Sequence, residues 1–316
     1  MMISFFKKDK ISKLMENFIE AHDIVKRYDG HTALDHVSVD VPRGCIYGLL
    51  GPNGAGKTSL IRIINRITMP DEGTVTFGGR PLQADDVTRI GYMPEERGLY
   101  KKMKVGDQIV YLARLKGMSK GEAVMAMLEW LDRFGLAEWR DKKLETLSKG
   151  MQQKVQFIAT VIHRPELLIF DEPFSGFDPV NADRLKVEIL RLREQGSTIL
   201  FSTHNMESVE EICEQITLIN HSKAVLQGSV KAIRQQHKQN IIAVHVPDDV
   251  AIAPHDELYE LLPPPQPASP ATHIRLRKGV AIRDAITWLN DNYTLTGFSE
   301  VLPSMHEIFV NTVKEN

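Results

Sequence analysis

The sequence predicts an α/β protein built on a mainly parallel sheet, with a second, smaller α+β domain at its carboxyl end. Three observations support this prediction. Short continuous apolar runs alternate with segments of helical periodicity through most of the 316 residues, as is typical of buried parallel strands joined by helices. One of these runs leads directly into a glycine-rich turn and a helix. Near Ser229 the alternation stops, and a proline-rich segment over 261–270 separates a new set of strands and helices.

The composition is that of a soluble globular protein without a strong charge bias. The formal net charge is −2 and hydrophobic residues make up 42% of the chain, so no global basic field favours nucleic acid as the main partner. Cys45 and Cys213 are too few for a disulfide framework or a zinc site. No apolar run approaches the ~18 residues that cross a bilayer, and we expect no secretion signal. If the protein works at a membrane, another chain is expected to span it.

Residues 1–20 form an extension for which two interpretations stay open. Apolar side chains recur at helical spacing at Ile11, Leu14, Met15 and Phe18, close to several lysines. This pattern is typical of a short amphipathic helix that touches a membrane surface. A frayed extension, or a natural translation start at Met15, explains the same residues.

Strands are predicted from residue 21 to residue 41, where Val37, Val39 and Val41 alternate with polar residues. Tyr28 lies in this segment. Its ring can stack on a purine base, or it can be an ordinary half-buried strand tyrosine. Spacing alone does not separate these two roles.

The glycine-rich turn is the most specific motif of the chain. It has the sequence Gly51-Pro52-Asn53-Gly54-Ala55-Gly56-Lys57-Thr58, and it is followed by Ser59 in a helical pattern. Glycines let successive backbone N–H groups form a concave anion site at a helix amino terminus. Lys57 is expected to contact the β- and γ-phosphates, and the Thr58 hydroxyl a magnesium ion. The octet therefore predicts a site for a nucleoside triphosphate.

A helical block interrupts the predicted strands. After two short strands the chain enters a charged loop at Glu95 and then shows helical patterns over 105–116 and 119–134, the second opened by a capping box. We interpret residues 96–150 as an inserted helical subdomain.

Carboxylates and a histidine stand at the ends of two further predicted strands. The apolar strand 167–170 ends at Asp171 and Glu172, and the strand 198–201 leads to His204. Because α/β sheets place their ligands at the carboxyl ends of the strands, these groups are expected near the phosphate site. There Asp171 would reach a magnesium ion, Glu172 would orient or deprotonate the attacking water, and His204 would contact the γ-phosphate or the water. Taken singly, such a carboxylate is often a helix cap and such a histidine is more often structural.

Residues 229–316 are predicted to form the small α+β domain. Strand patterns over 241–246 and 273–276 flank the proline-rich segment, and a helix over 281–290 and another capped by Ser304 follow. This part of the chain carries no chemical motif, so a role as an interface or stability element is expected.

Five motifs of the chain, taken in order, resemble those of ABC ATPases. The Walker A motif corresponds to 51–58, the signature to 147–151, Walker B to 167–173, the D-loop to 175–178 and the switch histidine to His204.

This resemblance covers residues 21–228 and implies a P-loop NTPase fold, an ABC ATPase cassette with a helical subdomain, which hydrolyses ATP with magnesium. Tyr28 falls where that family has its base-stacking aromatic. Residues 229–316 are similar only in general layout to accessory domains of bacterial ABC exporter ATPases. The segment 94–100 resembles those exporters, including a sodium-efflux-like branch.

Two motifs depart from the family pattern. The family signature is usually Leu-Ser-Gly-Gly-Gln, and here Lys149 and Met151 replace a glycine and the glutamine, while Ser148 and Gly150 keep the phosphate-facing helix start. Glu95 stands where the family usually has a magnesium-contacting glutamine. A carboxylate can also hold magnesium, although it adds negative charge beside the phosphates.

The resemblance also implies partners. A second ATPase subunit, identical or different, would form a head-to-tail dimer with two ATP molecules between the cassettes, so that Lys57 of one subunit and Ser148 of the other contact the same nucleotide. The helical insert and the Glu95 loop would pass the resulting motion to transmembrane permease subunits. The protein would then be a peripheral subunit at the cytoplasmic face of the cell membrane, serving export rather than import, with no nucleic acid partner.

Two other functions compete with this one. A soluble ABC ATPase acting on ribosomes or DNA usually carries a second cassette or a long coiled coil, and the sequence shows one cassette and no heptad insert. A purely regulatory nucleotide sensor conflicts with the presence of Glu172 and His204.

Overall fold

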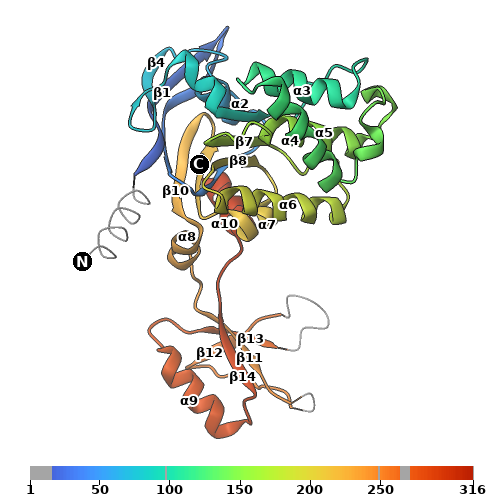
Figure 1. Cartoon of the computed structure of the whole chain (residues 1–316). Helices are drawn as coiled ribbons and strands as arrows, with labels where there is room; N and C mark the ends of the chain where they lie inside the picture. Colours follow the sequence, from blue (N-terminus) through green and yellow to red (C-terminus); the bar gives the residue numbers. More distant parts are fainter. Residues whose placement is uncertain (1–15, 97, 248–249, 264–270, 316) are drawn as a thin grey trace, which may run out of the picture. The chain divides into compact units, whose positions relative to one another are not determined.

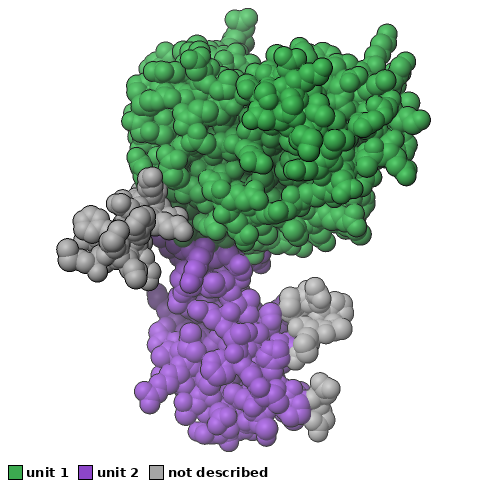
Figure 2. All heavy atoms as spheres, viewed as in Figure 1, with its two compact units in different colours: residues 1–230, 312–316 green, residues 231–311 purple. Residues whose placement is uncertain are grey.

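The computed structural model describes residues 16–96, 98–247, 250–263 and 271–315. The chain divides into two compact units, coloured separately in Figure 2. The first runs to Val230 and takes in the chain end from Thr312, and the second is Lys231–Asn311. None of the helices in the described parts is long and apolar enough to cross a membrane.

A six-stranded sheet forms the centre of the first unit (Figure 1). Its strand order is β10-β9-β3-β8-β7-β6, and the five strands from β9 to β6 are parallel, while β10 pairs antiparallel with β9. The strands are β3 (Ile46–Leu50), β6 (Ile90–Met93), β7 (Leu167–Asp171), β8 (Thr198–Thr203), β9 (Gln215–Asn220) and β10 (Lys223–Ser229). The continuous apolar runs β3, β7 and β8 are buried throughout, as expected for a sheet that is covered on both faces.

A second, antiparallel sheet has the order β2-β1-β4-β5. Its strands are β1 (Asn17–Tyr28), β2 (His31–Pro42), β4 (Glu72–Phe77) and β5 (Arg80–Pro81). The helical periodicity that we read through Phe18 is wrong at that residue, because Phe18 lies in β1 with its ring centroid 4.7 Å from that of Phe77 in β4. Burial against the sheet overrides the local pattern here. Ile11, Leu14 and Met15 lie outside the described residues.

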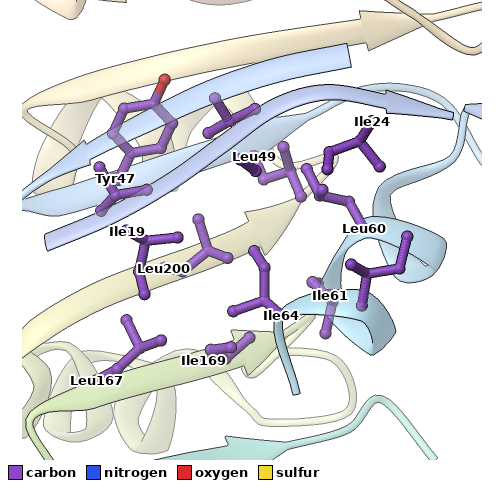
Figure 3. Packing of buried hydrophobic residues seen from close by; sticks show 14 of the residues in the cluster. Ile19, Ile24, Tyr47, Leu49, Leu60, Ile61, Ile64, Leu167, Ile169 and Leu200 are labelled. Atoms are coloured by element: carbon purple, nitrogen blue, oxygen red, sulfur yellow. The ribbon is translucent and has the colours of Figure 1, made fainter. Parts of the chain in front are cut away.

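The main core fills the space between the two sheets. Helix α2 (Lys57–Ile64) turns Leu60, Ile61 and Ile64 inward, toward Leu49 of β3 and Ile24 of β1 (Figure 3). On the opposite face of the central sheet, Phe157 of α5 (Lys149–Val161) stacks on Phe170 of β7 with ring centroids 5.6 Å apart. The phosphate-loop helix is therefore anchored by buried apolar side chains directly below the loop.

The inserted helices have their own core. Helices α3 (Val105–Leu115) and α4 (Lys120–Arg133) pack with α5 around a buried apolar cluster. The predicted capping box at α4 is present, since Ser119 N–H donates to Glu122 and Glu122 N–H donates to the Ser119 hydroxyl.

Two more helices belong to the first unit, and a third begins at Val230, directly before the second unit starts. They are α6 (Pro179–Glu194), α7 (Met206–Ile212) and α8 (Val230–Gln236). Short 3-10 turns lie at Ala84–Arg89, Ala137–Trp139 and Leu144–Thr146. Asp178 and Asn205 cap α6 and α7 with their side chains.

The second unit holds an antiparallel sheet of order β12-β13-β11-β14. Its elements are β11 (Ile241–His245), β12 (Tyr259–Leu261), β13 (Thr272–Leu276), α9 (Ile282–Asn292) and β14 (Gly297–Val301), and α10 (Met305–Glu315) follows. One face of the sheet packs on Ala285 and Leu289 of α9. The predicted box at α10 is present, because Ser304 N–H donates to Glu307 and Glu307 N–H donates to the Ser304 hydroxyl.

Candidate active site

The phosphate loop joins β3 to α2, and two of its glycines occupy positions where no side chain fits. A Cβ on Gly51 (φ 148°) would come within 2.2 Å of the Ile219 carbonyl oxygen, and one on Gly56 (φ 115°) within 2.3 Å of the Ala33 carbonyl oxygen. Gly56 precedes α2 without a side-chain cap. The first N–H groups of the helix are therefore left for a ligand, as at other anion-binding helix starts.

Lys57 lies inside this loop and is only 7% exposed. Its ammonium donates to the carbonyls of Gly51 at 2.6 Å and Pro52 at 3.1 Å. Burial lowers its pKa, while the carboxylates of Glu172, Asp171 and Glu95 act against that shift. The ammonium is thus held between backbone carbonyls and a group of acidic side chains, close to the position where phosphates would bind.

Asp171 is the last residue of β7 and is 4% exposed. Burial is the main cause that raises the pKa of its carboxyl, and the neighbouring charges of Glu172 and Glu95 add to it. Negative charge is therefore in excess at this end of the sheet, with Lys57 as its nearest compensation.

Glu172 follows with a left-handed backbone (φ 49°), which is uncommon for a residue with a side chain. Its Oε1 lies 2.6 Å from His204 Nδ1 and accepts the His204 backbone N–H at 2.9 Å. Its Oε2 accepts the Thr203 hydroxyl at 3.1 Å. Strands β7 and β8 end side by side, so the two sequence-predicted residues meet there.

A cleft of about 360 Å³ collects most of the predicted site residues. It is lined by Tyr28, His31, Ala33, Asn53, Gly54, Ala55, Gly56, Lys57, Thr58, Ser59, Glu95, Asp171 and Glu172. Gly51 and Pro52 do not line the cleft, but their carbonyls accept hydrogen bonds from the Lys57 ammonium, which does. His204 contacts it through Glu172.

Ser148 and Gly150 are the two predicted residues that the fold does not bring to this cleft. Ser148 caps α5, and its hydroxyl accepts the Met151 N–H at 3.3 Å. A Cβ on Gly150 would meet nothing within 4 Å. The start of α5 is therefore an open helix amino terminus away from the cleft of its own chain.

His31 and Ala33 line the cleft and were not predicted. Tyr28 and His31 are partners across a two-residue turn, with Gly30 at φ 72°. The Asp29-Gly30 pair is a strong signal for a tight hairpin. This signal is enough to place His31 beside Tyr28 from the sequence.

Two family descriptions match parts of this chain. Residues 34–175 match the family described as "ABC transporter", and residues 228–313 match "ATP-binding protein DrrA1-3-like, C-terminal domain". The chain is 41% identical to the uncharacterized ABC transporter ATP-binding protein YhaQ of Bacillus subtilis, over 92% of this chain and 96% of that protein. It is 30% identical to the daunorubicin/doxorubicin resistance ATP-binding protein DrrA of Streptomyces peucetius, over 73% and 71%.

A solved ATP-binding subunit of an ABC transporter superimposes with a TM-score of 0.65 at 28% identity, covering 69% of this chain and 92% of that one. None of these relatives is described as a ribosomal or DNA protein. The fold, the order of the motifs and the relatives lead to one conclusion. The chain belongs to the ABC transporter family and is an ATP-binding subunit that hydrolyses ATP.

Proposed function

We propose that this ATPase works as a head-to-tail dimer that drives export through a separate membrane permease. The observation that carries the proposal is the separation of Ser148 and Gly150 from their own nucleotide cleft. Their open helix start offers N–H groups and a helix dipole to an anion that another subunit must supply. The γ-phosphate of a partner's ATP meets that requirement. The partner is a second copy of this chain or a related subunit.

Within each site we assign the steps to residues of the cleft. The phosphate loop and Lys57 hold the phosphates, and Tyr28 stacks on the base. Glu172 accepts the proton of the attacking water, and His204 orients its carboxylate through the 2.6 Å contact.

We further assign magnesium to Thr58, Asp171 and Glu95. All three line the same cleft and offer the oxygen ligands that magnesium prefers. Burial, with the added negative charge of Glu172 and Glu95, raises the pKa of Asp171, and a divalent cation would offset that negative charge. When bound, the ion supplies positive charge at the phosphate oxygens.

The permease is proposed to dock on an apolar groove beside the Glu95 loop. This groove has a volume of about 340 Å³, and Tyr92, Leu99 and Leu112 are among its lining residues. Ile67 and Leu115, which also line it, are each 61% exposed. Gln156 of α5 donates to the Pro94 carbonyl at 2.9 Å, so the loop before Glu95 is tied to the signature helix. Docking here would hold the protein peripherally at the cytoplasmic face of the membrane.

Export is supported by the relatives and by the second unit. DrrA is described as a resistance protein, and the carboxyl-terminal match is to a DrrA-like domain. We take residues 21–228, extended to the start of β1, as the ATPase domain and 229–316 as an accessory domain.

The test is ATP-driven dimerisation of the Glu172→Gln variant, which should bind ATP without consuming it. Light scattering is expected to detect dimers with ATP and monomers with ADP. Adding Ser148→Arg should block the dimer and leave ATP affinity of the monomer nearly intact, as measured with a fluorescent nucleotide. If Ser148→Arg destroys monomer affinity and spares the dimer, the signature acts within its own chain and the proposal is wrong.

A further inference from the structure

Gln153 ties the signature helix to the D-loop through a buried side-chain amide. It lies in the second turn of α5 and is 7% exposed. Its Nε2 donates to the backbone carbonyl of Ser175. Gly176 packs against the same amide, since a Cβ placed on it would lie 3.5 Å from Nε2.

The other half of this amide is unsatisfied. Gln153 Oε1 is buried and has no hydrogen-bond partner within the described part of the chain. A buried acceptor without a donor costs free energy, so a neighbouring N–H that moved toward it would be stabilised. Gly176 lies beside this amide, and its φ of 80° and missing side chain permit its peptide to turn.

The D-loop is in turn hydrogen-bonded to the backbone of Glu172, the proposed catalytic base. Ser175 N–H donates to the Glu172 carbonyl at 3.1 Å, and Phe177 N–H donates to the Phe174 carbonyl at the same distance. Glu172 sits in the left-handed region, where its backbone is held by these neighbours. A displacement at Ser175 therefore reaches Glu172 through a single hydrogen bond.

We propose that Gln153 is a positioning residue that couples the two nucleotide sites of the dimer. One end of α5, at Ser148, is directed at the partner's nucleotide under the proposed function, on which this inference rests. Further along α5, Gln153 is bonded to the D-loop, which positions the Glu172 backbone. In this structure only Nε2 of the amide is bonded, to the Ser175 carbonyl. When the partner's ATP binds at the start of α5, an N–H of the D-loop also donates to Oε1, so that both ends of the amide are bonded. The Glu172 backbone, and with it the carboxylate that His204 and Thr203 already orient, thereby takes its catalytic position only after the opposite site has filled.

The first test replaces the amide with an apolar side chain of similar length, Gln153→Met. We expect unchanged KM for ATP and unchanged ATP-driven dimerisation in the Glu172→Gln background. The value of kcat should fall about 10- to 100-fold, as small displacements of catalytic groups do, and the Hill coefficient for ATP should fall toward one. The matched control is Gln235→Met, which changes an exposed glutamine of α8 and should leave all four quantities unchanged.

The second test is Gln153→Glu, which keeps the shape but cannot donate to Ser175 while ionised. Its ATPase activity relative to the unaltered protein should recover as the pH falls toward the pKa of the new carboxyl, because a protonated carboxyl donates as the amide does. A structural defect would give no such recovery.

Three results overturn the inference. Unchanged kcat or Hill coefficient in Gln153→Met means that the amide does not position Glu172. Loss of dimerisation together with kcat means that it serves the architecture of α5. If the ATPase activity of Gln153→Glu is low at every pH, the Gln153 amide does not act as a hydrogen-bond donor to Ser175. Failure of the proposed function looks different, since Glu172→Gln with Gln153 intact would then remain monomeric in ATP.

Discussion

The Glu172 carboxylate and the His204 imidazole form a hydrogen-bonded pair at the carboxyl ends of strands β7 and β8. Oε1 of Glu172 meets both Nδ1 and the backbone N–H of His204, at 2.6 and 2.9 Å. Oε2 is fixed separately by the Thr203 hydroxyl. Both carboxylate oxygens are therefore oriented, and the imidazole lies behind the carboxylate rather than among the residues that line the cleft.

Replacing Glu172 by glutamine should separate binding from turnover. The amide keeps the size of the side chain but cannot accept the proton of the attacking water, so kcat should fall by at least about 100-fold. ATP affinity should be unchanged within a factor of about two, because the proposed function assigns the phosphates to the loop and Lys57. Steady-state ATPase and nucleotide titration measure the two quantities. Retained turnover in the purified variant would remove Glu172 as the base.

His204→Ala should lower kcat about 10- to 100-fold without weakening ATP binding, because Glu172 loses the partner that orients Oε1. His204→Asn should recover part of the activity, since its side-chain amide can present a donor near the position of Nδ1. Equal activity of the alanine and asparagine variants would argue against an orienting hydrogen bond. The same ATPase assay distinguishes the outcomes.

Lys57→Ala should weaken ATP binding itself. Charge-assisted hydrogen bonds contribute about 1.5–3 kcal/mol each, so the Kd for ATP should rise roughly 10- to 100-fold. The control is Lys120→Ala, an exposed lysine at the start of α4, for which affinity should not change. Equal affinities for the two variants would contradict the position of Lys57 at the phosphates.

Gly56→Ala should damage the loop more than Gly54→Ala. Both glycines have positive φ, 115° and 80°, which costs alanine about 1–2 kcal/mol. Only the Cβ at Gly56 would also collide with the Ala33 carbonyl, at 2.3 Å, whereas the one at Gly54 would meet nothing within 4 Å. Chemical denaturation and ATP titration should both rank the variants in this order. The reverse ranking would mean that the close approach at Ala33 is not what requires glycine.

Acid should destabilise the first unit partly through His163. Burial, with the nearby charge of Lys116, lowers the pKa of this imidazole from 6.5 to about 4. The unfolded chain takes up the proton first as the pH falls, so stability is complete above pH 6.5 and is lost between there and about pH 4. A shift of this size corresponds to at most roughly 3 kcal/mol. In denaturant titrations His163→Phe should flatten the pH dependence over this window, and an unchanged slope would contradict the assignment.

The strands and the phosphate loop could be predicted because their signals are local. Continuous apolar runs identified β3, β7 and β8, and an octet with fixed spacing identified the turn before α2. Glu172 and His204 were predicted at adjacent strand ends, and their direct hydrogen bond depends on the pairing of β7 with β8.

What the sequence could not supply depends on contacts between distant segments. Phe18 continues a helical pattern along the chain, and only its packing on Phe77 in β4 makes it a strand residue. The separation of β1, β2 and β4 into their own sheet follows from the same kind of pairing. Gln153 carries no sequence signal for its bond to Ser175, because the two residues meet only after α5 and β7 pack on each other.

The nucleotide cleft draws its walls from two different sheets. Tyr28 and His31 belong to the hairpin of the antiparallel sheet. Lys57 lies after strand β3 of the central sheet, and Asp171 is the last residue of its strand β7. Under the proposed function, selection among purine bases and selection between diphosphate and triphosphate therefore rest on separate parts of the chain. Substitutions in the hairpin would then change which base is accepted while the chemistry of cleavage stays intact, so base preference and catalytic power would be free to evolve independently in this protein.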